Sequence, residues 1–250
     1  MRLDLSGKVA LVTGGGRGIG RACCLALAEA GAAVAVNYSR SAEAAQEVKA
    51  AIEAKGGRAV AIGADVSSLE ETQAMFAKVK EAFGTLDILV NNAGVIHDTL
   101  LLTMKPDQWS KVLGVSLNGA YHCTRLAAEI MMRKRAGKVI SISSVVAVQG
   151  GRGQTNYAAA KAGLVAFTRA CAAEMGGRGI QFNAVLPGMI VTGMSEKVRK
   201  HAGEQIMARI PAGRFGEPED VARLIVFLAS PASDYINGQA IAVDGGLLTG

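Results

Sequence analysis

A tyrosine and a lysine four residues apart are the first candidates for chemistry, in the segment Tyr157-Ala-Ala-Ala-Lys161. The pattern of residues 155–175 predicts a helix, and residues four apart lie on the same helical face. A lysine ammonium beside a phenol favours the phenolate, so we expect it to lower the tyrosine pKa from its ordinary value of about 10. The pair therefore predicts a tyrosine that exchanges a proton with a substrate oxygen near neutral pH.

Ser144 is the third candidate. It ends a predicted strand over 137–144, and twelve residues separate it from Tyr157. A hydroxyl at this place would hydrogen-bond the same substrate oxygen and orient it. The predicted catalytic set is therefore Ser144, Tyr157 and Lys161.

A glycine-rich turn follows the first predicted strand, with the sequence Thr13-Gly14-Gly15-Gly16-Arg17-Gly18-Ile19-Gly20. Glycines at such a turn let the backbone approach a pyrophosphate, and the N-terminus of the next helix attracts its negative charge. The turn predicts a nucleotide site at the start of the chain.

The elements that must position these residues alternate along the chain. Strands are predicted at 8–14, 32–38, 58–66, 86–94, 137–144, 180–188 and 238–246. Helices are predicted at 18–30, 41–55, 68–84, about 107–134, 155–175 and 218–230. Solidly apolar strands that alternate with helices predict a parallel sheet covered on both faces. Right-handed crossovers then give an α/β fold, a doubly wound, seven-stranded Rossmann sheet in a single domain over 1–250.

Composition and charge argue against several classes of protein. No apolar stretch reaches the ~18 uncharged residues that span a bilayer, and Asp4 and Lys8 interrupt the N-terminal apolar run, so we expect no signal peptide. The net charge of +6 is spread, and its densest cluster, Arg133-Lys134-Arg135, lies at a predicted helix end. We therefore expect a cytoplasmic protein with neither nucleic-acid nor membrane partners.

Cysteine and histidine spacing predicts no metal site. Neither residue type shows a CxxC or other ligand spacing; the positions are Cys23, Cys24, Cys123, Cys171, His97, His122 and His201. We interpret the cysteines as buried small apolar residues.

Together these motifs resemble the short-chain dehydrogenase/reductase family over almost the whole chain. The glycine turn has the family's TGxxxGxG form, Asn91-Asn92-Ala93-Gly94 matches its NNAG, and Tyr157 with Lys161 matches its YxxxK. The resemblance implies an oxidoreductase whose nicotinamide cofactor carries the hydride, with Lys161 also holding the nicotinamide ribose. The implied cofactor-binding residues are Thr13, Gly14, Gly16, Arg17, Gly18, Ile19, Gly20, Tyr38, Ser39, Arg40, Asp65, Val66, Asn91, Ala93, Gly94, Tyr157, Lys161, Pro187, Gly188, Ile190 and Thr192.

The end of the second predicted strand decides between NAD and NADP. NAD enzymes place an acid there to bind the ribose, but this chain has Asn37-Tyr38-Ser39-Arg40. Arg17 and Arg40 are instead suited to bidentate contact with a 2′-phosphate. We therefore predict NADP(H).

One position departs from the family pattern. The family usually has an Asn seven residues after a Trp on the long helix, whereas here Trp109 is followed at that spacing by Ser116. The family's Asn is thought to distort the helix so that a backbone carbonyl holds a relay water. A serine that bonds its own helix backbone would keep that kink, so we expect an active enzyme in which the role of Ser116 is open.

Within the family, residues 143–146, 153–163 and 209–222 resemble the reductases that act on 3-oxoacyl thioesters of acyl carrier protein. This implies NADPH-dependent reduction of a 3-oxoacyl thioester in fatty-acid synthesis. In that subgroup two arginines dock the acidic carrier, and the matching positions are Arg135 and Arg178. The resemblance also implies a homotetramer, and residues 189–215 are predicted to form a substrate lid.

Other functions share most of these motifs. A reductase of acetoacetyl-CoA or of polyketide intermediates is one alternative, and a catabolic dehydrogenase of a sugar, polyol or steroid is another. A nucleotide sensor without catalysis belongs to a different class, and the Ser144, Tyr157 and Lys161 set argues against it.

Overall fold

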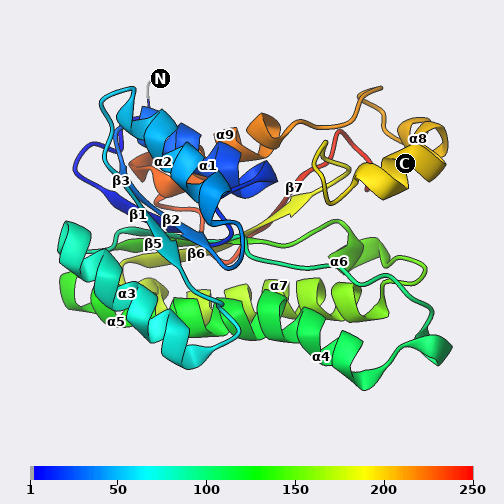
Figure 1. Cartoon of the computed structure of the whole chain (residues 1–250), viewed down its shortest axis with the longest axis horizontal. Coiled ribbons are helices and arrows are strands. Elements are labelled where there is room, and N and C mark those ends of the chain that lie inside the picture. The colour runs from blue at the N-terminus through cyan, green and yellow to red at the C-terminus, as the bar shows by residue number, and fades with distance from the viewer. Residues whose placement is uncertain (1–2, 250) are drawn as a thin grey trace.

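A single parallel sheet forms the centre of the protein, for which a computed structural model describes residues 3–249 (Figure 1). The strand order is β3-β2-β1-β4-β5-β6-β7. The strands are β1 (Val9–Val12), β2 (Ala33–Tyr38), β3 (Ala59–Gly63), β4 (Ile88–Asn91), β5 (Gly137–Ile142), β6 (Ile180–Pro187) and β7 (Ala240–Val243). The order reverses between β1 and β4, which is the switch point where doubly wound sheets bind ligands. The predicted Rossmann architecture is confirmed.

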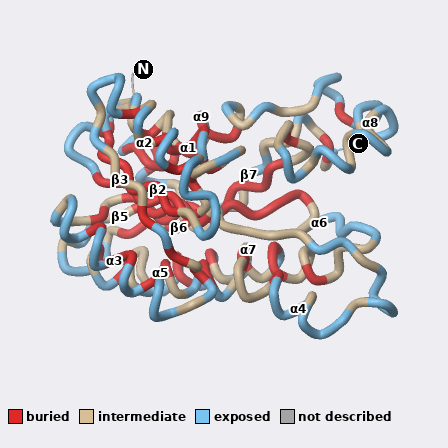
Figure 2. Tube along the Cα trace, in the orientation of Figure 1, coloured by how far each residue is buried: buried red, intermediate tan, exposed pale blue. Residues whose placement is uncertain are grey.

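Two layers of helices cover this sheet, because its strands are apolar on both faces. One layer holds α1 (Gly18–Glu29), α2 (Ala42–Glu53) and α9 (Pro218–Ala229), and the other holds α3 (Leu69–Phe83), α5 (Gly119–Lys134) and α7 (Thr155–Met175) (Figure 1). Each layer packs its own apolar cluster against the sheet. Figure 2 shows the buried residues concentrated in the strands and on the helix faces turned toward them. All four cysteines are buried and free, as predicted.

The helical region predicted over about 107–134 is not one continuous helix. The structure divides it into α4 (Pro106–Leu113), a π-helical turn η2 (Gly114–Asn118) and α5. A helix that was not predicted, α8 (Glu196–Met207), lies inside the expected lid, and Ala202 within it has a non-helical backbone. None of its residues is buried, although Ile206 packs against the apolar cluster of Val145, Ile210 and Leu247.

The remaining elements are short connections. They are η1 (Leu101–Thr103), α6 (Val146–Gln149), η3 (Gly176–Arg178) and η4 (Pro231–Ser233). None of the helices in the described part of the chain combines the length and apolar character that a membrane crossing requires.

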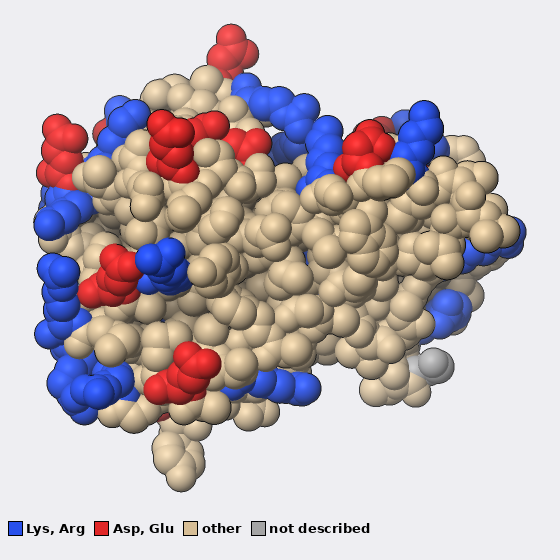
Figure 3. Space-filling view, turned by 90° about the horizontal axis from the view of Figure 1, so that it is seen from below, with Lys and Arg blue, Asp and Glu red and all other residues tan. Residues whose placement is uncertain are grey.

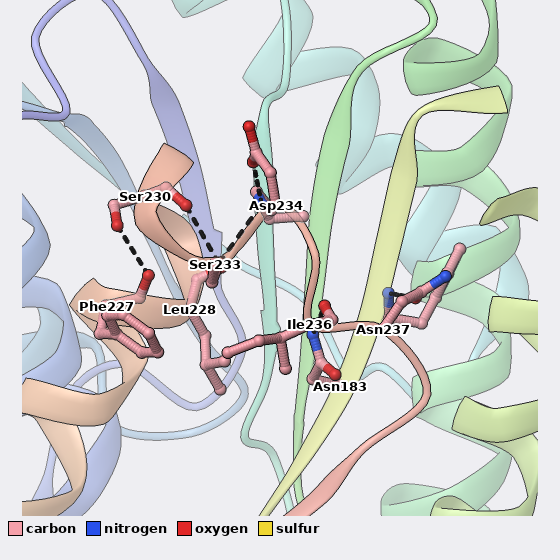
Figure 4. Close-up of polar contacts among 10 residues, drawn as sticks. Asn183, Phe227, Leu228, Ser230, Ser233, Asp234, Ile236 and Asn237 are labelled. Carbon is pink, nitrogen blue, oxygen red and sulfur yellow. Dashed lines mark hydrogen bonds and ion pairs between the residues drawn. The ribbon is translucent and has the colours of Figure 1, made fainter. Parts of the chain in front are cut away.

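The connection from α9 to β7 is held by buried and partly buried polar contacts (Figure 4). The Ser233 hydroxyl donates to the Leu228 carbonyl at 2.9 Å, and the Lys138 ammonium lies 2.6 Å from a carboxylate oxygen of Asp234. Asn183 of β6 donates to the Ile236 carbonyl at 2.8 Å and accepts the N–H of Gln239 at 3.0 Å. These contacts fix β7 beside β6 and so complete the sheet.

Candidate active site

A cavity of about 1150 Å³ opens at the carboxyl edge of the sheet. The glycine turn, the ends of several strands and helix α8 all contribute to its wall. It contains most of the residues predicted from the sequence, namely Gly14, Gly16, Arg17, Gly18, Ile19, Tyr38, Ser39, Arg40, Asp65, Val66, Ala93, Gly94, Ser144, Tyr157, Lys161, Pro187, Gly188, Ile190 and Thr192. The predicted nucleotide and catalytic residues thus share one cavity.

Two neighbouring elements bring the catalytic candidates together. Ser144 follows β5, while Tyr157 and Lys161 lie one turn apart near the start of α7. The Lys161 ammonium donates to the Ile142 carbonyl at 2.7 Å and lies 5.6 Å from the centre of the Tyr157 ring. Ser143 donates to the Lys161 carbonyl at 2.7 Å. Strand β5 therefore holds α7 at the place where its tyrosine faces Ser144.

Burial decides the protonation of these groups. It raises the pKa of Tyr157 to about 12; the hydrogen bond with Ser144 acts in the opposite direction, and the carboxylate of Asp98 adds to the rise. Burial also lowers the pKa of Lys161 to about 8. The expectation that Lys161 would lower the tyrosine pKa below its ordinary value is therefore wrong for this structure. Loss of hydration outweighs the hydrogen bond with Ser144, and Tyr157 is a phenol at neutral pH.

The glycine turn brings the backbone into the cavity. Gly14 has a positive φ of 63°, and its N–H donates to the side-chain oxygen of Asn37 at 3.1 Å. A Cβ at Gly20 would collide with the Gly14 carbonyl oxygen, so the first turn of α1 packs directly under the loop. The wall at this point is backbone, next to the N-terminus of α1, which suits a pyrophosphate.

Three residues predicted to bind the cofactor lie behind the cavity wall. The Thr13 hydroxyl accepts the N–H groups of Asn92 and Ala93, both at 2.9 Å. Gly20 packs under the loop, and Asn91 points into the core, where its amide donates to the Thr124 hydroxyl at 2.9 Å. These contacts support the wall and do not form it.

Several residues of the wall were not predicted. Asn92 lines the cavity, and its amide donates to the Thr13 and Gly14 carbonyls at 2.9 and 3.1 Å. Asn37 and Asp98 also line it. The sequence signal for the two asparagines is their place at or just after the end of an apolar strand, where parallel strands open onto a binding site.

Ser116 lies in the π-helical turn, 1% exposed. The helix departs from regular α-helical geometry at this position, but the serine hydroxyl has no hydrogen-bond partner among the described residues, so it does not bond its own helix backbone. The Ser116 hydroxyl and the Lys161 ammonium lie 3.4 and 3.5 Å from the position that a Cβ of Gly94 would take. Both polar groups therefore flank the NNAG turn.

Arg135 and Arg178 lie at the opposite edge of the sheet. Arg135 ends α5 with a positive φ of 52°, and its guanidinium donates to the Gly177 carbonyl at 3.1 Å, next to Arg178 in η3. Strand β5 begins after Arg135 and ends before Ser144, so about 20 Å of strand separates the two ends. Figure 3 shows basic side chains gathered along the left edge, where α5 ends, and few charges in the middle of the face.

Comparison with known proteins agrees with this geometry. A family model described as enoyl-(acyl carrier protein) reductase matches residues 14–248. The chain belongs to the short-chain dehydrogenase/reductase family. It is therefore an oxidoreductase acting on CH–OH and C=O groups, with a nicotinamide cofactor.

Curated relatives and solved structures add detail to this membership. A 3-oxoacyl-[acyl-carrier-protein] reductase of Synechocystis is 45% identical over 245 residues, 98% of each chain. The reductase FabG of Staphylococcus aureus is 46% identical over 240 residues, 96% of this chain and 98% of the relative. A structure assigned as a gluconate dehydrogenase of Agrobacterium tumefaciens is 36% identical, with a TM-score of 0.96 over 100% of this chain and 99% of that one. One assigned as an NAD(P)-dependent gluconate 5-dehydrogenase of Beutenbergia cavernae, with NADP at low occupancy, is 40% identical, with a TM-score of 0.94 over 100% of both chains.

Proposed function

We propose that this protein reduces the ketone of a 3-oxoacyl thioester to the 3-hydroxyacyl thioester in fatty-acid synthesis, with NADPH as reductant. The observation that carries the proposal is the convergence of Ser144, Tyr157 and Lys161 with the glycine turn in one cavity. Relatives that are 44–46% identical over nearly the full chain bear the name of that activity.

The proposed cofactor is NADP(H). Arg17 and Arg40 line the cavity beside Tyr38 and Ser39, and the end of β2 carries no carboxylate that would repel a 2′-phosphate. The bare backbone at Gly14 fits a pyrophosphate, and Lys161 lies at the catalytic end, where it would hold the nicotinamide ribose. When bound, the nicotinamide supplies the hydride.

The chain's own residues would then orient the ketone and donate the proton to its oxygen. Ser144 donates a hydrogen bond to the ketone oxygen and orients it toward Tyr157. Because burial keeps Tyr157 a phenol, the tyrosine is in the form that can donate its proton to that oxygen. The Lys161 ammonium stabilises the phenolate that remains. The protonation state at neutral pH thus favours reduction.

The substrate end of the cavity is apolar. Val145, Ile210 and Leu247 form a buried cluster with Met189 and Ile206 packed against it. Such a wall suits an acyl chain, and α8, which contributes Val198 and Ile206 to the lining, is the proposed lid over it. A sugar-acid dehydrogenase is the second candidate, because the neighbouring structures assigned as gluconate dehydrogenases share this fold at 36–40% identity.

Assembly and compartment remain proposals. A homotetramer is supported by the small number of charges in the middle of the face in Figure 3 and by the exposed Tyr121 of α5, which packs edge-to-face on Phe167 of α7. We place the protein in the cytoplasm, where four free thiols persist without forming disulfides.

The test is NADPH oxidation with acetoacetyl-CoA and with a carrier-bound 3-oxoacyl chain, beside gluconate oxidation with NADP⁺. We expect turnover of both thioesters, a preference for NADPH over NADH, and no turnover of gluconate. The Tyr157→Phe variant should bind NADPH as the parent does and lose about 100-fold or more in kcat, because it lacks the proton donor. Turnover of gluconate alone, or activity retained by Tyr157→Phe, would contradict the proposal.

A further inference from the structure

The Val66 carbonyl is contacted from two helices. His122 of α5 donates from Nδ1 to the Val66 oxygen at 3.0 Å, because a carbonyl can only accept. The Thr72 hydroxyl of α3 lies 3.3 Å from the same oxygen, but its single proton has a shorter contact, 2.7 Å, with the Ser68 carbonyl. The N–H of Val66 has no protein acceptor in the described part of the chain. Val66, which lines the cavity, therefore has its carbonyl bound by the protein, while its N–H is available to a ligand.

Helix α5 also determines how closely Val66 packs against it. A Cβ at Gly119 would lie 2.6 Å from a methyl carbon of Val66, so the valine sits directly on the helix backbone. One turn of α5 thus contacts Val66 twice: Gly119 packs against its side chain, and His122 donates a hydrogen bond to its carbonyl. The His122 ring is in turn packed beside Tyr121, with ring centres 5.6 Å apart.

Asp65 is fixed by the other side of the same segment. Its N–H donates to the Glu71 carboxylate at 2.8 Å, and its own carboxylate accepts the N–H of Ser67 at 2.9 Å. Asp65 is therefore held by α3 and by its own turn, whereas α5 supplies the shorter hydrogen bond to Val66 and the backbone surface on which Val66 packs. His122 is the α5 side chain that makes this link.

We propose that His122 is a positioning residue for the adenine end of the nucleotide site, acting through the Val66 carbonyl. The inference rests on the proposed nucleotide site, in which Arg17 and Arg40 hold the 2′-phosphate. It places the base beside Val66, which lines the cavity just after β3, next to the end of β2. His122 touches neither the cofactor nor the substrate. Its effect is therefore confined to the affinity for the adenosine half, and it acts equally on NADPH and NADH.

The experiment compares His122→Phe, which keeps an aromatic ring beside Tyr121 but loses the donor, with His122→Asn, whose amide can still donate to the Val66 oxygen. Binding of NADPH and of adenosine 2′,5′-bisphosphate to the free protein is measured by titration. For His122→Phe we expect both dissociation constants to rise about 5-fold, the effect of one partly buried hydrogen bond, and the NADH constant to rise by the same factor. The kcat at saturating NADPH and the KM for acetoacetyl-CoA should stay unchanged. His122→Asn should restore most of the affinity.

Arg125→Gln is the matched control, because Arg125 lies on the same helix in an exposed pair with Glu129 and should leave every constant unchanged. Unaltered affinity of His122→Phe for adenosine 2′,5′-bisphosphate, or a fall in kcat of the same size, would overturn the inference. If His122→Phe does not fold, His122→Ala serves in the same comparison. A parent protein that binds no NADPH would instead refute the proposed function, so the two failures are distinguishable.

Discussion

At the scale of single residues, the environment of Tyr157 and Lys161 matters as much as their spacing. The two groups share a helical face, but the Lys161 ammonium donates to a strand carbonyl and its own pKa is lowered to about 8. Burial of the phenol then raises the Tyr157 pKa to about 12. Before the reaction, Tyr157 is therefore a protonated phenol beside the Lys161 ammonium, which loses its proton near pH 8. A protonated tyrosine is the form that can donate a proton to a ketone.

This arrangement predicts the pH dependence of reduction. Reduction needs Tyr157 as phenol and Lys161 as ammonium, and the lysine has the lower pKa, so kcat/KM for the ketone should be level below pH 8 and fall as pH rises through about 8. Initial rates across a pH series with saturating NADPH would show this fall in kcat/KM. A profile that stays level to about pH 10 would mean that the lysine charge is not required.

Asp98→Asn supplies the control for this pH profile. The Asp98 carboxylate raises the Tyr157 pKa, so its removal should lower that pKa and make alcohol oxidation with NADP⁺ faster on the alkaline side, where the phenolate is the base. The reduction limb near pH 8 should stay in place, because it belongs to Lys161.

At the scale of elements, the π-helical turn between α4 and α5 is the main local departure from regular structure. It places Ser116 next to the NNAG turn, with a hydroxyl that has no partner among the described residues. The π-helical turn is therefore present without a serine-to-backbone hydrogen bond. Directly after the turn, α5 packs closely on Val66 at Gly119.

Ser116→Ala is the corresponding test. Removing a buried hydroxyl that has no partner should raise the free energy of unfolding by about 1 kcal/mol, and turnover should stay within about threefold because the turn remains. Denaturant unfolding and steady-state kinetics measure the two effects. A loss of stability together with a large loss of kcat would show that the Ser116 hydroxyl has a partner in the working enzyme and takes part in proton transfer.

At the scale of the whole molecule, the cavity and the proposed docking arginines occupy opposite edges of the sheet. Arg135 donates to the carbonyl of Gly177, which directly precedes Arg178, while Ser144 and Tyr157 lie at the other end of β5. A carrier held by these arginines would therefore be far from the cavity of the same chain.

Charge reversal at both positions tests the docking proposal. Arg135→Glu with Arg178→Glu should raise the KM for a carrier-bound 3-oxoacyl chain by about 10-fold or more, because two attractions to an acidic partner become repulsions. The kcat/KM for acetoacetyl-CoA should not change. Arg125→Glu, on the same helix but away from this edge, is the control. Equal losses on both substrates would argue for a structural defect instead of docking.

The sequence by itself determined the fold and led to the proposed catalytic set. Strand and helix periods are local, so alternation of apolar strands with helices predicts a doubly wound sheet. The i, i+4 spacing of Tyr157 and Lys161 likewise needs only a helix, and the glycine turn needs only a strand before it and a helix after it. These predictions hold because each depends on residues within a few turns of one another.

The tertiary structure decided what depends on partners distant in the chain. Burial by several elements set the Tyr157 and Lys161 pKa values against the local expectation. Successive residues at a strand end point to opposite sides, so Asn92 lines the cavity while Asn91 bonds Thr124. The hydrogen bond from His122 to Val66 spans 56 residues, and no local pattern predicts it. Contacts between residues this far apart in the chain form only when the sheet and both helix layers are assembled.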